Sequence, residues 1–204
     1  MDTRSILTIG ALCFACGASA QELRLSGGYN GSNVREAGEH RWVGRAGYQF
    51  GADILLGNTW FARAGAHLMV RNLNYALLTT DTNGVSVEGN TGFRYTSRSL
   101  RVPLHVGRFI LDQRDDPTVN AYAFAGPTAL FNLNARLEQD EFEVETAPVQ
   151  WSIGFGGGAQ YRFVFVEAGY DVAMSNIFEG DALSTDPRVN QVYAVAGVRL
   201  KLAE

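Results

Sequence analysis

Hydrophobic and polar residues alternate with a period of two over long stretches of this chain. In residues 149–163, aromatic and aliphatic residues occupy one face, and glycine or polar residues occupy the other. An ordinary half-buried strand has about five or six residues. A strand that crosses lipid is longer, with apolar side chains facing outward and small or polar side chains facing inward. The pattern therefore predicts a membrane-spanning strand.

Seven more segments show the same kind of alternation. The predicted strands are 23–30, 42–56, 60–72, 96–111, 118–134, 149–162, 166–175 and 190–202. The connections after the second, fourth and sixth strands are short, and the others are long. This sorting is typical of barrels with short periplasmic turns and long external loops. The chain is predicted to be all-β: an eight-stranded antiparallel up-and-down transmembrane β-barrel.

The fifth predicted strand has an ambiguous pattern. Tyr122 and Phe124 are expected to face lipid, and Gly126-Pro127 is expected to mark a bulge, because proline removes a backbone donor. The facing of residues beyond this point stays open. Arg108 interrupts the outward face of the fourth strand, near an end where a long side chain can reach water.

Charged residues recur at positions predicted to face the barrel interior. Opposite charges there should pair, since an isolated buried charge is costly. We expect a structural network that plugs the lumen; the alternative is a narrow ion path gated by exchange of pairs. The network is predicted to contain Arg45, Asp53, Arg63, Arg101, Glu167, Asp171 and Arg199.

His67 and His105 are predicted to point inward on neighbouring strands. A structural hydrogen-bonded pair is expected, because a metal site needs a third ligand and a supporting shell. Ser99, either histidine and Asp171 could form a catalytic triad, but no spacing in the sequence selects them. The prediction therefore contains no catalytic, cofactor-binding or metal-binding residue.

The N-terminus has the pattern of an export signal. Arg4 is followed by an apolar stretch too short to span a bilayer as a helix, and then by small residues at 18–20. Residues 1–20 are predicted to be a signal peptide and residues 21–204 the barrel domain. Both cysteines lie within the signal, so no disulfide is expected; lipid attachment at Cys16 is an alternative. The formal net charge of −4 is unclustered and favours no nucleic-acid partner.

An acidic run follows the fifth predicted strand. Residues 138–145 contain five carboxylates but lack the ligand spacing of a known calcium loop, so a solvated external loop is expected. Alternation across residues 141–145 suggests that the fifth and sixth strands extend as a hairpin whose edge binds a partner by strand addition. His40 is expected to be solvated in the first external connection.

Four sequence stretches carry a resemblance to a known family. They are LRVPLHVGRF (100–109), AFAGPTAL (123–130), GFGGGAQYRF (154–163) and EAGYDVAMSNI (167–177). With these stretches the chain resembles the PorT-like outer-membrane β-barrel proteins, also called the porin family or outer membrane protein β-barrel domain. The resemblance implies an outer-membrane location and insertion by the barrel-assembly machinery.

These observations predict a non-enzymatic outer-membrane barrel with a packed polar lumen and a structural or surface-interaction role. Its expected partners are outer-membrane lipid and an extracellular or envelope protein at the external loops. No cofactor is expected. An eight-stranded barrel is too narrow for general diffusion, so a narrow solute or ion conduit is the main alternative. An outer-membrane lipid-modifying enzyme and a soluble lipocalin-like barrel are the others.

Overall fold

The chain forms a closed barrel of eight antiparallel strands, as the sequence predicted. The computed structural model describes residues 22–35, 41–80, 86–111, 118–137, 147–177 and 188–202. The strands are β1 (Glu22–Arg35), β2 (Arg41–Gly57), β3 (Trp60–Thr80), β4 (Ser86–Phe109), β5 (Val119–Leu137), β6 (Val149–Tyr161), β7 (Val164–Ala173) and β8 (Arg188–Lys201). Each strand pairs with the next, and β8 pairs with β1. No helix among these residues is long and apolar enough to cross a membrane.

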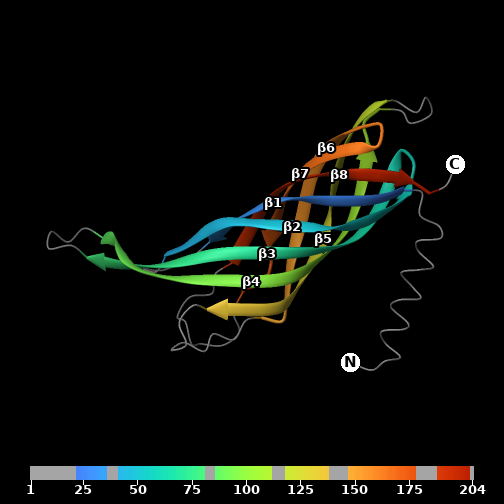
Figure 1. Cartoon of the computed structure of the whole chain (residues 1–204). Helices are drawn as coiled ribbons and strands as arrows, with labels where there is room; N and C mark the ends of the chain where they lie inside the picture. The colour runs from blue at the N-terminus through green and yellow to red at the C-terminus, as the bar shows by residue number, and fades with distance from the viewer. Residues whose placement is uncertain are drawn as a thin grey trace, which may run out of the picture.

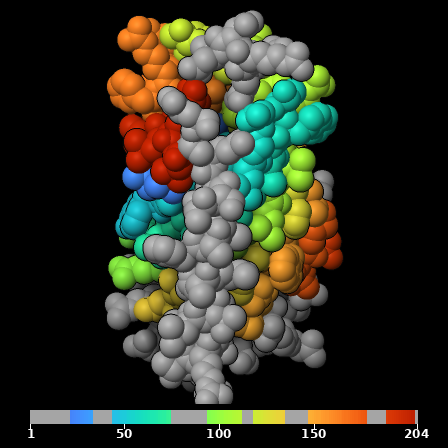
Figure 2. All heavy atoms as spheres, turned by 90° about the vertical axis from the view of Figure 1, so that its right-hand side faces the viewer, coloured from blue at the N-terminus to red at the C-terminus, as the bar shows by residue number. Residues whose placement is uncertain are grey.

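The closure between β1 and β8 is complete along both strands. All fourteen residues of β1 have a partner in β8, from Glu22 opposite Lys201 to Arg35 opposite Arg188. In the space-filling view, side chains of β8 (red) lie beside those of β1 (blue) (Figure 2). Neither strand is left as a free sheet edge, which a segment inside a bilayer could not tolerate.

An apolar belt covers the outside of the barrel. Exposed hydrophobic side chains alternate with buried ones along the strands, and they include Trp60, Leu68, Leu104, Val106, Trp151, Phe155, Tyr161, Val166, Val198 and Leu200. On β6 the belt runs from Trp151 to Tyr161, ten residue steps. At the usual strand rise and barrel tilt this is about 25 Å, the height of the apolar band of outer-membrane barrels.

The two ends of the barrel differ. Trp60 follows Gly57 after two turn residues, and only Arg162 and Phe163 separate β6 from β7. Arg162 has a positive φ of 51° and Gly57 a φ of 116°, conformations that tight reversals need. The β6–β7 reversal thus lies slightly before the predicted position. We call this the short-turn end and the opposite end the long-connection end.

β3 and β4 are much longer than predicted. Residues 73–95, most of which were expected to form a long external connection, instead lie largely in these two strands, which pair as far as Thr80 and Ser86. Within the described ranges, β2 pairs with β3 as far as Ala76, and β5 pairs with β4 as far as Tyr95. A two-stranded ribbon therefore projects beyond the rest of the barrel (Figure 1). The segment was predicted to be a connection because it contains residue types common in turns, among them Asp81, Asn83, Gly84 and Asn90.

The predicted orientation of Tyr122 and Phe124 is wrong. Both side chains point into the barrel and are buried, while Ala123 and Ala125 face outward. No bulge occurs at Gly126-Pro127 either, because β5 keeps one register with β6 from Val119 to Phe131. The register shift on β5 lies further along, opposite Arg98 and Ser99 of β4. Inward and outward positions therefore keep alternating through Gly126.

The inward aromatics fit against glycines on other strands. A Cβ atom on Gly158 would lie 2.5 Å from the Tyr122 hydroxyl, and one on Gly169 would lie 2.4 Å from the Tyr193 ring. Inward glycines thus make room for large rings. These rings belong to a buried cluster, the aromatic layer, formed by Leu55, Phe61, Phe109, Tyr122, Phe124, Tyr193 and Val195.

Candidate functional site

The polar lumen is the candidate functional site, because most buried charges of the described residues gather there. Nine charged side chains with at most 8% exposure point inward: Glu22, Arg24, Asp53, Arg63, Arg71, Arg101, Glu167, Asp171 and Arg199. Six of the seven residues predicted for the network are among them. The period-two pattern places them inward, and the barrel's shear decides which of them meet.

Arg63 connects three strands near the middle of the lumen. Its Nη1 donates to Oε2 of Glu167 at 2.6 Å, and the Tyr122 hydroxyl donates to the same oxygen at 3.1 Å. The Arg63 guanidinium also lies over the Phe124 ring, 4.1 Å from its centroid. β3, β5 and β7 are thereby tied together through side chains.

Arg101 and Asp171 form a second connection across the barrel. Nε of Arg101 donates to Oδ2 of Asp171 at 2.8 Å, and Nη2 donates to Oδ1 at 3.0 Å. This two-pronged geometry is the strongest form of an arginine–carboxylate pair. The Arg101 guanidinium also lies 4.5 Å from the centroid of the Tyr193 ring.

A third group of charged side chains lies at the short-turn end, and the sequence predicted only part of it. Arg199 was predicted to face inward, and it donates to Glu22 at 3.1 Å. Glu22 also pairs with Arg24, which donates to Gln160 at 3.0 Å and covers the Tyr122 ring at 4.6 Å. The alternation of Glu22 and Arg24 with Leu23 and Leu25 was the signal that could have found them.

The two inward histidines do not form the predicted pair. Nε2 of His67 lies 3.0 Å from Oδ1 of Asp53. His105 lies 2.8 Å from Nη2 of Arg63 and 3.1 Å from the Thr128 hydroxyl. The register explains this result, because His67 lies opposite Arg101 and His105 lies opposite Arg63. The histidines are therefore at different heights in the lumen.

The described side chains do not assemble the triad considered from the sequence. The Ser99 hydroxyl donates to Oδ1 of Asn132 at 2.7 Å. Both carboxylate oxygens of Asp171 accept from Arg101. The serine and the carboxylate are thus each engaged with a group other than a histidine.

Arg45 is not part of the lumen network, so this prediction is wrong. A bulge between Arg45 and Tyr48 shifts the β2 register by one residue against β3. This shift turns Arg45 to the exposed outer face. There its guanidinium donates to the side-chain oxygen of Asn74, from Nη2 at 2.8 Å and from Nε at 3.0 Å.

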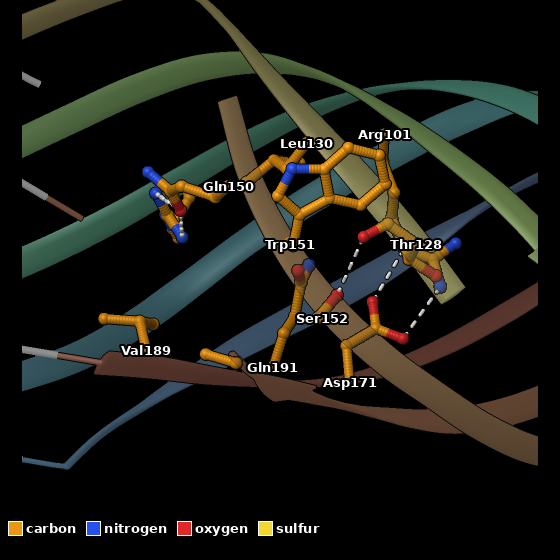
Figure 3. Close-up of a pocket in the computed structure, with 11 residues that line it drawn as sticks. Arg101, Thr128, Leu130, Gln150, Trp151, Ser152, Asp171, Val189 and Gln191 are labelled. Atoms are coloured by element: carbon orange, nitrogen blue, oxygen red, sulfur yellow. Dashed lines mark hydrogen bonds and ion pairs between the residues drawn. The ribbon is translucent and has the colours of Figure 1, made fainter. Parts of the chain in front are cut away.

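A small cavity lies between the Arg101–Asp171 pair and the long-connection end. Its volume is about 20 Å³, and its polar lining includes Arg71, Gln150, Ser152 and Gln191, several of which are labelled in Figure 3. Such a volume holds about one water-sized occupant. The Arg63–Glu167 pair and the aromatic layer lie further toward the short-turn end.

Several sequence predictions concern residues outside the described ranges. These are the export signal with Cys16, His40 in the first connection, and the acidic run at 138–145 with its proposed hairpin. They stay predictions.

No family model and no curated protein matches the chain, so the PorT-like resemblance also stays a prediction. Solved structures do match. The outer membrane protein OprG from Pseudomonas aeruginosa aligns with a TM-score of 0.56 and 10% identity, covering 90% of this chain and 97% of that one.

Two further solved structures are similar over most of the chain. Ail, the attachment invasion locus protein of Yersinia pestis, solved in complex with the heparin analogue sucrose octasulfate, aligns with a TM-score of 0.49 and 18% identity over 88% of this chain and 98% of that one. Neisserial surface protein A aligns with a TM-score of 0.46 and 14% identity over 88% and 97%. The likeness to OprG, together with the strand pairing, shows that this chain has the eight-stranded fold of an outer-membrane β-barrel.

Proposed function

We propose that this chain is a non-enzymatic barrel of the outer membrane, whose filled lumen makes it a rigid support for the connections at one end. In this proposal residues 1–20 direct export and are removed, and residues 21–204 form the barrel, inserted by the barrel-assembly machinery. The observation that carries the proposal is the combination of an apolar exterior with an ion-paired, filled interior.

The exterior supports a place in lipid. Leu104 and Val106 on β4, and Ile110 just after it, are more than half exposed, and a continuous apolar surface of this kind is rare on a protein that stays in water. Arg108 lies over the Trp60 ring at 5.5 Å, at the short-turn end. Aromatic and basic side chains commonly meet the headgroups at such a boundary. A soluble lipocalin-like barrel requires the opposite arrangement of faces.

The interior supports a structural role over a conduit. A narrow path for ions would have to cross both the Arg101–Asp171 pair and the aromatic layer. Exchange of one ion pair would not open the aromatic layer, since its side chains are buried and packed against one another. The hydrogen bonds of Ser99 to Asn132 and of Asp171 to Arg101 likewise give no support to a lipid-modifying enzyme.

The long-connection end is the proposed place for a protein partner from the envelope or the cell exterior. The β3–β4 ribbon projects there beyond its neighbours (Figure 1). Among the described residues, no strand pairs with the outer sides of the ribbon beyond Ala76 and Tyr95. Exposed edges of this kind bind partners by strand addition.

Planar-bilayer conductance tests the filled-lumen part of the proposal. We expect no channel activity from the purified barrel or from Arg101→Ala, because the aromatic layer closes the lumen in both. Each sample is first shown to migrate as a folded barrel in unheated detergent gels. Steady conductance of the unmodified barrel would favour the conduit, and conductance of Arg101→Ala alone would identify the ion pair as a gate.

Membrane fractionation tests the location. The full chain, expressed in a Gram-negative host, should separate with outer-membrane markers on a sucrose gradient. Recovery in the soluble periplasmic fraction as a folded barrel would contradict the proposal, whatever the conductance result.

A further inference from the structure

The lumen contains one more buried cation than buried anion among the described residues. Five arginines and four carboxylates are buried there. Arg24 and Arg199 pair with Glu22, Arg63 pairs with Glu167 and Asp53, and Arg101 pairs with Asp171. In the part of the chain that the structure describes, no carboxylate pairs with the fifth, Arg71. An uncompensated buried charge is costly.

The guanidinium of Arg71 has more hydrogen-bond donors than it has partners among the described residues. Its guanidinium is buried, with 2% of the residue exposed. Nη1 and Nη2 both reach Oε1 of Gln150, at a long 3.3 Å, and the Tyr95 side chain supplies a further hydrogen bond. These partners are neutral, so they do not cancel the charge. Nε of Arg71 and Nε2 of Gln150 have no hydrogen-bond partner among the residues that the structure describes.

Both unpartnered donors belong to residues that line the small cavity. Asp171 also lines it, but its two oxygens are bound to Arg101, as the dashed lines in Figure 3 show. The Arg101–Asp171 pair is therefore neutral as a unit. The lining of the cavity thus combines a fixed positive charge with two donor nitrogens that have no partner among the described residues, and a donor set of this kind recognises an anion.

The size of the cavity limits the anion. A volume of about 20 Å³ holds an occupant of about the size of one water molecule. Sulfate, phosphate and sugar sulfates are larger. A halide matches both the volume and the single excess charge.

We propose that the lumen binds one monovalent, halide-sized anion, chloride by charge and size, between Nε of Arg71 and Nε2 of Gln150. The anion neutralises the fifth arginine and joins β3 to β6 at the long-connection end. The site needs only the folded barrel, so it does not depend on the proposed cellular role.

Thermal unfolding in detergent tests this site. The purified barrel is compared in chloride, bromide and gluconate at equal ionic strength, since gluconate is too large for the cavity. The unfolding midpoint should rise by several degrees, and saturably, with chloride or bromide. The Arg71→Met barrel should lose this dependence and should unfold in gluconate no earlier than the unmodified barrel, because it lacks the uncompensated charge.

Arg199→Met is the matched control, since it removes a lumen arginine that already has a carboxylate. Its midpoint should fall in all salts while the chloride dependence remains. Gln150→Leu keeps the charge and removes one donor, so it should weaken the chloride response several-fold. Crystals grown in bromide should give one anomalous peak beside Arg71, and Arg71→Met crystals should give none there.

Equal midpoints of the unmodified barrel in chloride and gluconate would overturn the proposal. So would a chloride response that persists in Arg71→Met, or a bromide peak that avoids Arg71. If a carboxylate of the chain itself occupied the cavity, chloride would have no site there, and the midpoints in chloride and gluconate would be equal.

Discussion

At the scale of single residues, inward glycines and rings fit so closely that one added methyl group would clash with a ring. The Tyr193 ring is 2% exposed and lies under the Arg101 guanidinium, so it cannot move aside to admit another atom. The hydrogen side chain of Gly169 is therefore a packing requirement rather than a matter of backbone freedom.

We predict that Gly169→Ala destabilises the folded barrel by about 1 to 3 kcal/mol, the usual cost of overpacking. Tyr193→Leu replaces the ring by a smaller side chain. In this background, Gly169→Ala should therefore cost much less than in the unmodified barrel. Gly27→Ala is the control, since a Cβ there meets nothing closer than 3.7 Å. Urea unfolding in detergent measures the unmodified barrel, the three single variants and the double variant, and equal penalties for Gly169→Ala with and without Tyr193 would contradict the packing argument.

At the scale of the strands, depth in the bilayer should govern tolerance of charge. Leu104 lies opposite Ala64, near the middle of the belt that begins at Trp60 on β3. Ile110 lies just beyond β4, at the short-turn end.

We predict that Leu104→Arg destabilises the barrel by about 2 to 4 kcal/mol and that Ile110→Arg costs at most about 1 kcal/mol. The reason is that a side chain near the bilayer surface reaches the headgroups, whereas one at the centre does not. Reversible unfolding in lipid vesicles gives both values. Similar costs at the two positions would mean that the belt is not seated in lipid as proposed.

Strand order and the facing of most strands followed from the sequence, because lipid and lumen select opposite residue types. Where both faces are apolar, this contrast disappears, and Tyr122 and Phe124 were assigned to lipid although Ala123 and Ala125 occupy that face. The bulge that turns Arg45 outward is a one-residue register shift, which alternation alone cannot locate.

The partners inside the lumen were also beyond the sequence. Arg63 meets Glu167 and Arg101 meets Asp171 across the barrel, and such pairings depend on how far the strands are staggered around the cylinder. Inward position can be read from a single strand, but stagger is a property of the closed sheet. That no carboxylate of the described residues pairs with Arg71 could be recognised only after the other pairs were known.

At the scale of the whole molecule, these cross-lumen contacts connect strands that share no backbone hydrogen bonds. Arg101 on β4 and Asp171 on β7 are separated by two strands around the wall. The pair therefore resists deformation of the barrel's cross-section.

We predict that Arg101→Met destabilises the barrel by about 3 to 5 kcal/mol, since it leaves a buried carboxylate without its partner. Arg101→Met combined with Asp171→Leu should cost much less than that. Arg108→Met, on the lipid-facing side, is the control and should have little effect. A double variant as unstable as the sum of its single changes would show that the pair acts through something other than charge compensation.

The seam between β1 and β8 has a consequence for the order of events during assembly. Residues 22 and 201 are paired neighbours, yet almost the whole chain separates them, so the contact is of the slowest kind to form. Until the last strand arrives, the first has one row of backbone groups without partners, and a bilayer offers them no water. Before β8 pairs with β1, the seven earlier strands therefore need a chaperone surface or an aqueous compartment. The closed barrel can enter lipid only after this last pairing has formed.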